Sequence, residues 1–179
     1  MIPVLQQLYS GLEERRQRML GRIREMSEAQ SSFREEPKAW TPIQVAQHVA
    51  IAEQVGVDAM VHLKDRPSKP RRLAQRLGYA AVWVILKLGL RVKSPARRTI
   101  PDGEVSLTEL EPEWDRVRQR LSDFLETLDE RALSTAGFMH PVAGPLNLHE
   151  ALVFMTRHLD HHLRQLDRIA TSKNFPGGP

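Results

Sequence analysis

The chain has 179 residues, a formal net charge of +4 and no cysteine. The missing cysteine excludes disulfides, thiolate metal ligands and a cysteine nucleophile, so His, Asp or Glu must hold any metal ion. The length predicts one domain over residues 1–179, large enough to enclose its own core. Residues 1–20 lack the unbroken apolar segment of a secretory signal. Together with the absence of cysteine, this leads us to expect a cytoplasmic protein.

Helical spacing of apolar residues dominates the chain, and no alternating run predicts a strand. We therefore expect an all-α protein. The first predicted helix covers residues 4–28, with solvated Arg and Glu on its outer face. The second begins at Thr41, because Pro42 suits the first helical position and Gln44 can complete a capping box. It should continue to about Leu63.

A basic insertion, residues 64–98, follows the second helix. It holds eleven Lys or Arg and one acid, Asp65. Subtracting this local +10 from the total of +4 leaves −6 for the rest of the chain, so the basicity belongs to the insertion. With 6% aromatic residues and no recognition motif, we expect no specific nucleic-acid partner. Residues 73–90 predict an extra helix, apolar on nearly all sides after Leu77 and too short to span a membrane.

Two further helices complete the prediction. A third is expected near residues 112–128, with Ser106 and Thr108 left open as alternative caps because Pro112 fits neither well. The fourth should cover residues 147–170 and end in a flexible tail at residues 171–179. Joined in this way, the four main helices predict a bundle with one long crossover connection that carries the insertion.

Three of the seven histidines are predicted to point inward. His158 and His162 are four residues apart, so they project from one helix face on successive turns. Apolar residues lie within about 60° of that face. His48 is surrounded in the same way on the second helix. Three neutral imidazoles can hold one zinc, nickel, copper or iron ion and leave a position open, as catalytic sites require.

The same residues have a plain structural interpretation. A lone inward histidine such as His48 is often a hydrogen-bonded core residue, and paired histidines also occur on surface helices. His62 lies roughly 21 Å from His48 along the helix axis, too far to share an ion. His161 falls at the edge of the buried face. His140 and His149 are expected to be exposed, although the loop that carries His140 can close over a site.

Three segments of the chain resemble the DinB/YfiT-like family of metal-dependent enzymes. They are WTPIQVAQH at 40–48, HPVAGPL at 140–146 and HLDHHLRQ at 158–165. Their order and spacing suit the whole chain. The resemblance implies a four-helix bundle, often dimeric, with a divalent nickel or zinc ion on His48, His158 and His162. The long basic insertion departs from the family pattern and can reshape or cover the entrance to the site.

The resemblance also implies a reaction class. Family members with known chemistry are similar to transferases and isomerases that use low-molecular-weight thiols. This implies a thiol-dependent transferase acting on a small electrophilic molecule. A metal-dependent hydrolase remains open, as does a non-catalytic metal-binding or interaction module that works through the insertion. We assign no catalytic side chain.

Two glutamines and the oligomeric state complete the expectations. Gln44 and Gln165 each lie one turn from a predicted ligand and are candidates to orient ligands or substrate, although a capping or surface role is equally open. We expect a homodimer that buries the apolar helix of the insertion, as the family implies, in preference to a peripheral membrane contact.

Overall fold

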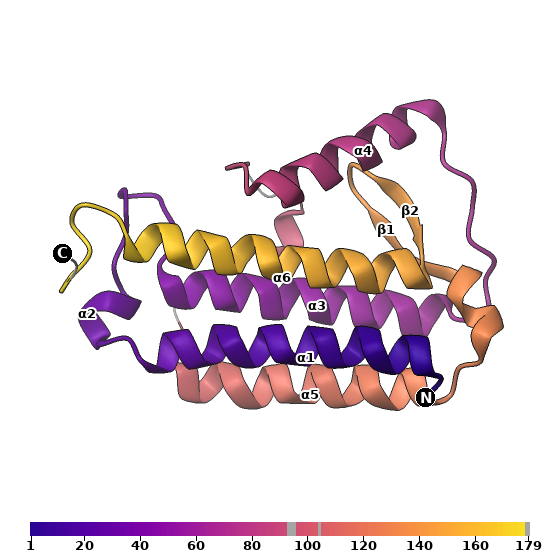
Figure 1. Cartoon of the computed structure of the whole chain (residues 1–179), viewed down its shortest axis with the longest axis horizontal. Coiled ribbons are helices and arrows are strands. Elements are labelled where there is room, and N and C mark those ends of the chain that lie inside the picture. Colours follow the sequence, from indigo (N-terminus) through magenta and orange to yellow (C-terminus); the bar gives the residue numbers. More distant parts are fainter. Residues whose placement is uncertain (93–95, 104, 178–179) are drawn as a thin grey trace.

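Four long helices form the body of the protein in this computed structural model, which describes residues 1–92, 96–103 and 105–177. They are α1 (Pro3–Arg24), α3 (Pro42–Leu63), α5 (Leu107–Glu126) and α6 (Leu148–Ala170). Both α1 and α3 pack on α5 and on α6, so α1 and α3 occupy opposite corners of the bundle. In Figure 1, α1 and α6 run in one direction and α3 and α5 in the other. The predicted four-helix bundle is confirmed.

Side-chain caps explain where α3 and α6 begin. The Thr41 hydroxyl accepts a bond from the Gln44 N–H, and the Gln44 side-chain oxygen accepts one from the Thr41 N–H, both at 3.2 Å. Asn147 and Glu150 form the same reciprocal pair at the start of α6. Each pair satisfies backbone donors that a helix start leaves free. The starts predicted at Thr41 and Asn147 are therefore confirmed.

The first predicted helix is too long in one respect. It ends at Arg24, and Ser27 caps a separate short helix, α2 (Glu28–Ser31), through a capping box with Gln30. Because Ser27 bonds its side chain to a backbone N–H, it favours a new helix start over continuation of the old one.

The third long helix begins earlier than predicted. Ser106 caps α5 together with Glu109, so Pro112 lies inside the helix instead of at its start. A proline there removes one bond, to the carbonyl of Thr108. Since Thr108 is exposed and close to the helix start, water can satisfy that carbonyl.

A small hairpin corrects the expectation of a chain without strands. Strands β1 (Ala136–His140) and β2 (Gly144–Asn147) pair antiparallel and pack against α6. Strands of five and four residues are too short to display a clear alternation in the sequence. Gly137 lies so close to α6 that an added Cβ would be 2.7 Å from the Ala151 Cβ, so this contact requires a glycine.

The insertion forms a helix outside the bundle. Helix α4 (Leu73–Leu88) lies across α6 and β2, and Gly89 ends it with a φ of +67° (Figure 1). On the face of α4 that packs against the protein, Val82 and Leu86 are buried. On its opposite face, four apolar side chains are 51–74% exposed: Leu73, Leu77, Val84 and Leu88. One face of this helix is thus covered by the rest of the protein, as predicted. Burial of its exposed face in a dimer stays a prediction. Residues 93–95 of the insertion lie outside the described residues.

Beyond α4, the 3₁₀ turn η1 (Arg97–Thr99) packs on α3, and η2 (Glu130–Ser134) precedes the hairpin. In the tail, Phe175 packs edge-on against Phe33 with ring centroids 5.4 Å apart, and residues 178–179 lie outside the described part. Among the described residues, the helices lack the combination of length and apolarity needed to cross a bilayer.

Candidate metal centre

The structure brings His48, His158 and His162 together between α3 and α6. One ring nitrogen of each lies within 4.8 Å of the corresponding atoms of the other two. The Nε2 atoms of His158 and His162 are 3.0 Å apart. The His48 ring centroid lies 5.2 Å from that of His158 and 4.8 Å from that of His162. We call these three residues the histidine centre.

Burial keeps these imidazoles neutral. His48 and His162 are 4% and 5% exposed, and His158 is partly buried. Loss of hydration lowers the pKa of His48 below its ordinary value and lowers the pKa values of His158 and His162 further. The proximity of the other histidines adds to this effect for His158 and His162. All three rings therefore present the deprotonated form that binds metal ions.

Hydrogen bonds at the outer nitrogens set the direction of two rings. The His48 Nδ1–H donates to the carbonyl oxygen of Thr99 at 2.6 Å, because a carbonyl can only accept. The His162 Nδ1 lies 2.8 Å from Oε1 of Gln165 and donates to it in the same way. A neutral imidazole that donates through Nδ1 keeps a lone pair on Nε2. The two bonds therefore point lone pairs toward the middle of the histidine centre.

The donor set fits a divalent ion such as zinc or nickel. Ligands bound at about 2.0–2.1 Å in a tetrahedral arrangement stand about 3.3 Å apart, close to the 3.0 Å between His158 and His162. Imidazole suits zinc, nickel, copper and iron. Three protein nitrogens leave at least one coordination position for a substrate or water. Hydrogen bonds donated by the outer ring nitrogen, like those from His48 to Thr99 and from His162 to Gln165, fix ligand orientation in known metal sites.

Aromatic side chains form the walls of the histidine centre. The Trp40 ring lies 4.6 Å from His48, and Phe154 stacks on His158 with centroids 5.6 Å apart and an interplanar angle of 14°. His140 reaches Phe154 from the hairpin, with centroids 5.0 Å apart. These rings keep the surroundings of the imidazoles apolar, which maintains their low pKa values.

His140 is partly buried, which corrects the expectation that it is exposed. Its Nδ1 accepts bonds from the backbone N–H groups of Val142 and Ala143, so the proton of the neutral ring is on Nε2. Burial lowers its pKa to about 4. The hairpin, which the sequence pattern did not reveal, places this ring against Phe154.

The remaining candidates take different positions. His161 is partly buried beside His162, while His62 and His149 are exposed. Gln44 bonds to Thr41, Arg34 and the Gly103 carbonyl, which ties a loop to the start of α3. The group that orients His48 is instead the Thr99 carbonyl. This contact is not predictable from the sequence, because any residue type supplies a backbone carbonyl.

A second buried polar group lies elsewhere in the bundle. Glu53 is 2% exposed, and its carboxylate accepts bonds from the Trp114 indole N–H at 2.5 Å and from Arg118 at 2.7 Å. Burial raises the pKa of Glu53, and the positive charge of Arg118 opposes that rise. We call Glu53, Trp114 and Arg118 the Glu53 cluster.

Fold and site together define a four-helix-bundle protein with a three-histidine centre. The family profile of the DinB superfamily matches residues 11–166, so the chain belongs to that superfamily. Among curated proteins, no sequence matches the chain significantly.

Two solved structures share the fold. TT2238, described as a four-helix bundle protein, is 25% identical, with a TM-score of 0.54 over 92% of this chain and 98% of the other. YfiT from Bacillus subtilis, described as a probable metal-dependent hydrolase with an unusual four-helix bundle topology, is 16% identical. Its TM-score is 0.61 over 93% of this chain and 85% of YfiT.

Proposed function

We propose that this protein is an enzyme that holds a divalent nickel or zinc ion on His48, His158 and His162 and transfers a low-molecular-weight thiol to a small electrophilic molecule. The observation that carries the proposal is the convergence of three neutral imidazoles within 4.8 Å. Membership in the DinB superfamily supports it. A bound divalent ion supplies positive charge that lowers the pKa of a thiol or of water, so that a nucleophile forms near neutral pH.

The chain's own residues orient and shield the site. Thr99 and Gln165 fix the rings of His48 and His162 through their Nδ1 atoms, so the donor set exists before a substrate arrives. Trp40 and Phe154 limit the access of bulk water, which strengthens electrostatic interactions inside the site. Because the chain has no cysteine, a reacting thiol must come from a separate molecule.

A second candidate, metal-dependent hydrolysis, is favoured by the fold shared with YfiT, which is described as a probable metal-dependent hydrolase. The same donor set serves water as readily as a thiol. The two functions differ in the nucleophile, and that difference can be measured.

The test has two stages. Elemental analysis of protein purified without a histidine tag should find one divalent ion per chain, and a variant with all three histidines replaced by Ala should have none. The cobalt-substituted protein should then change its visible spectrum on addition of 2-mercaptoethanol. It should also catalyse the displacement of chloride from 1-chloro-2,4-dinitrobenzene by this thiol, which forms the thioether and releases chloride and a proton. An unchanged spectrum together with hydrolysis of 4-nitrophenyl acetate would replace the transferase with the hydrolase. A metal-loaded protein inactive in both assays would favour a non-catalytic module.

A further inference from the structure

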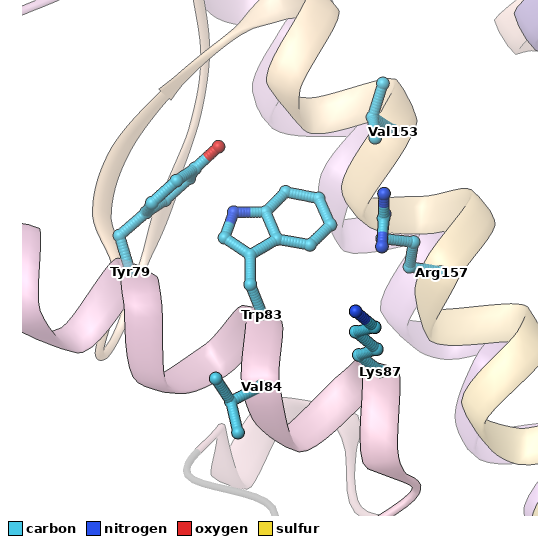
Figure 2. A pocket seen from close by; sticks show the side chains of 6 residues that line it. All are labelled: Tyr79, Trp83, Val84, Lys87, Val153 and Arg157. Atoms are coloured by element: carbon cyan, nitrogen blue, oxygen red, sulfur yellow. The ribbon is translucent and has the colours of Figure 1, made fainter.

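A groove of about 370 Å³ lies between α4 and α6, outside the four-helix bundle. Its six lining residues are Tyr79, Trp83, Val84 and Lys87 from α4, and Val153 and Arg157 from α6 (Figure 2). This volume falls at the lower end of the roughly 300–1,000 Å³ found for small-molecule sites. The groove is therefore large enough for a small ring compound.

The apolar part of the groove is held in place by its own contacts. Trp83 extends from α4 toward α6 and lies between Tyr79 and Arg157 in Figure 2. Tyr79 meets it edge-on with ring centroids 5.5 Å apart. The Arg71 guanidinium lies 4.1 Å from the Tyr79 ring centroid and pairs with Glu150 on α6. This ordered aromatic pair offers an apolar surface for a flat ligand.

Two positive charges line the same groove without a negative partner. The Arg157 guanidinium lies 4.7 Å from the Trp83 ring centroid. Among the described residues, neither Lys87 nor Arg157 forms an ion pair. By contrast, Arg15 of α1 and Arg71 of the insertion pair with Asp160 and Glu150 on α6. Like charges that share one groove repel each other, and an anion between them would be attracted by both.

The groove and the histidine centre lie on different sides of α6. Arg157 and His158 are neighbours in sequence, but successive helical residues point about 100° apart. Arg157 lines the groove below α4, while His158 faces His48 on α3. A ligand in the groove therefore makes its contacts without touching the histidine centre.

We propose that this groove binds a small aromatic carboxylate. The ring of the ligand packs against Trp83 and against Val153 on the α6 wall, and its carboxylate is held by Lys87 and Arg157. Both the ring and the carboxylate of the ligand are needed for binding. An exposed ion pair alone contributes little to affinity, and a neutral ring gives up the attraction of two cations.

Calorimetric titration of the full chain with 2-naphthoate tests this site, with 2-naphthamide as a neutral analogue of the same shape. We expect saturable binding of one naphthoate per chain and binding of the amide about tenfold weaker. Lys87→Gln and Arg157→Gln should each weaken naphthoate binding about threefold and leave amide binding nearly unchanged. Trp83→Leu should weaken both ligands.

Matched variants separate a defined site from general attraction. Lys173→Gln and Arg131→Gln remove the same charge from exposed positions elsewhere and should leave the naphthoate affinity unchanged. His162→Ala should also leave it unchanged, because the groove does not include the histidine centre. Equal loss in the charge controls, equal affinity for the amide, or loss of binding in His162→Ala would overturn the proposal. So would an affinity that falls as protein concentration rises, since a second copy would then occupy the groove.

Discussion

The bundle encloses two polar clusters, the Glu53 cluster and the histidine centre, whose polar atoms find their partners in different ways. In the Glu53 cluster, both carboxylate oxygens accept N–H bonds, one from Trp114 and one from Arg118. In the histidine centre, His48 and His162 use Nδ1 for bonds that point outward, and the remaining nitrogens converge within 4.8 Å. A carboxylate matched by its donors is complete without a ligand. In the histidine centre the Nε2 atom of His162 accepts a bond from the Nε2–H of His158 at 3.0 Å, and a cation that replaced this proton would be bound by both rings. Buried polar groups therefore indicate a binding site only where atoms able to coordinate a ligand converge on one point.

Breaking the Glu53 cluster should have the largest effect. Arg118→Met removes the cation beside a buried carboxylate and should destabilise the fold by about 3–5 kcal/mol. Urea denaturation measures the change. As a control, Arg116→Met alters a side chain that is 68% exposed and should cost less than about 0.5 kcal/mol. Equal midpoints for the two variants would show that the cluster does not contribute to stability in this way.

The histidine centre should stabilise the fold only through an added ion. At a free nickel or zinc concentration 100 times its dissociation constant, the gain is about 2.7 kcal/mol, visible as a higher melting temperature. His158→Ala should abolish this gain, because the ion loses one of three ligands. His149→Ala, at an exposed position, should retain it. A metal-induced shift that survives in His158→Ala would contradict the assigned ligand set.

Acid should lower the stability of the metal-free protein through the histidine centre. Burial places the folded-state pKa of His48 below its unfolded value, so between these values the unfolded chain binds more protons. The stability of the metal-free protein should therefore be complete above about pH 6.5 and fall as the pH decreases from there. His48→Gln should reduce this slope by up to about 1.4 kcal/mol per pH unit. Urea denaturation in a chelator between pH 7.5 and 5 measures it, and identical slopes would be the contrary result.

The smallest effect should come from the outward bonds of the histidine centre. Gln165→Ala removes the acceptor of the His162 Nδ1–H and should weaken metal binding about tenfold, as loss of such partners does in other metal sites. Gln165→Glu keeps an acceptor and should preserve or increase affinity. Competition with a chromogenic chelator measures both, with the exposed Gln17→Ala as control. No change in Gln165→Ala would mean that the ring of His162 is oriented by its packing.

Features carried by local spacing were predictable from the sequence. The cap at Thr41 and the pairing of His158 with His162 depend on residues three or four positions apart, which one helix brings together. The hairpin is recognised instead by its packing on α6, and the Thr99 carbonyl by its contact with the distant His48. Every residue type has a backbone carbonyl, so the sequence does not reveal which one bonds to His48. For that reason the four long helices and the inward direction of the three histidines were predictable, while the wall around His140 and the orienting group of His48 were not.

The separation of the histidines along the chain also governs when the centre can form. His158 follows His48 by 110 positions. At a synthesis rate of about 5–20 residues per second, that distance corresponds to roughly 6 to 22 s on the ribosome. During this interval the nascent chain carries one of the three imidazoles, and its orienting carbonyl at Thr99 is itself made 51 positions later. An ion held by all three imidazoles could therefore bind only after α6 has docked, so its binding would be coupled to completion of the fold.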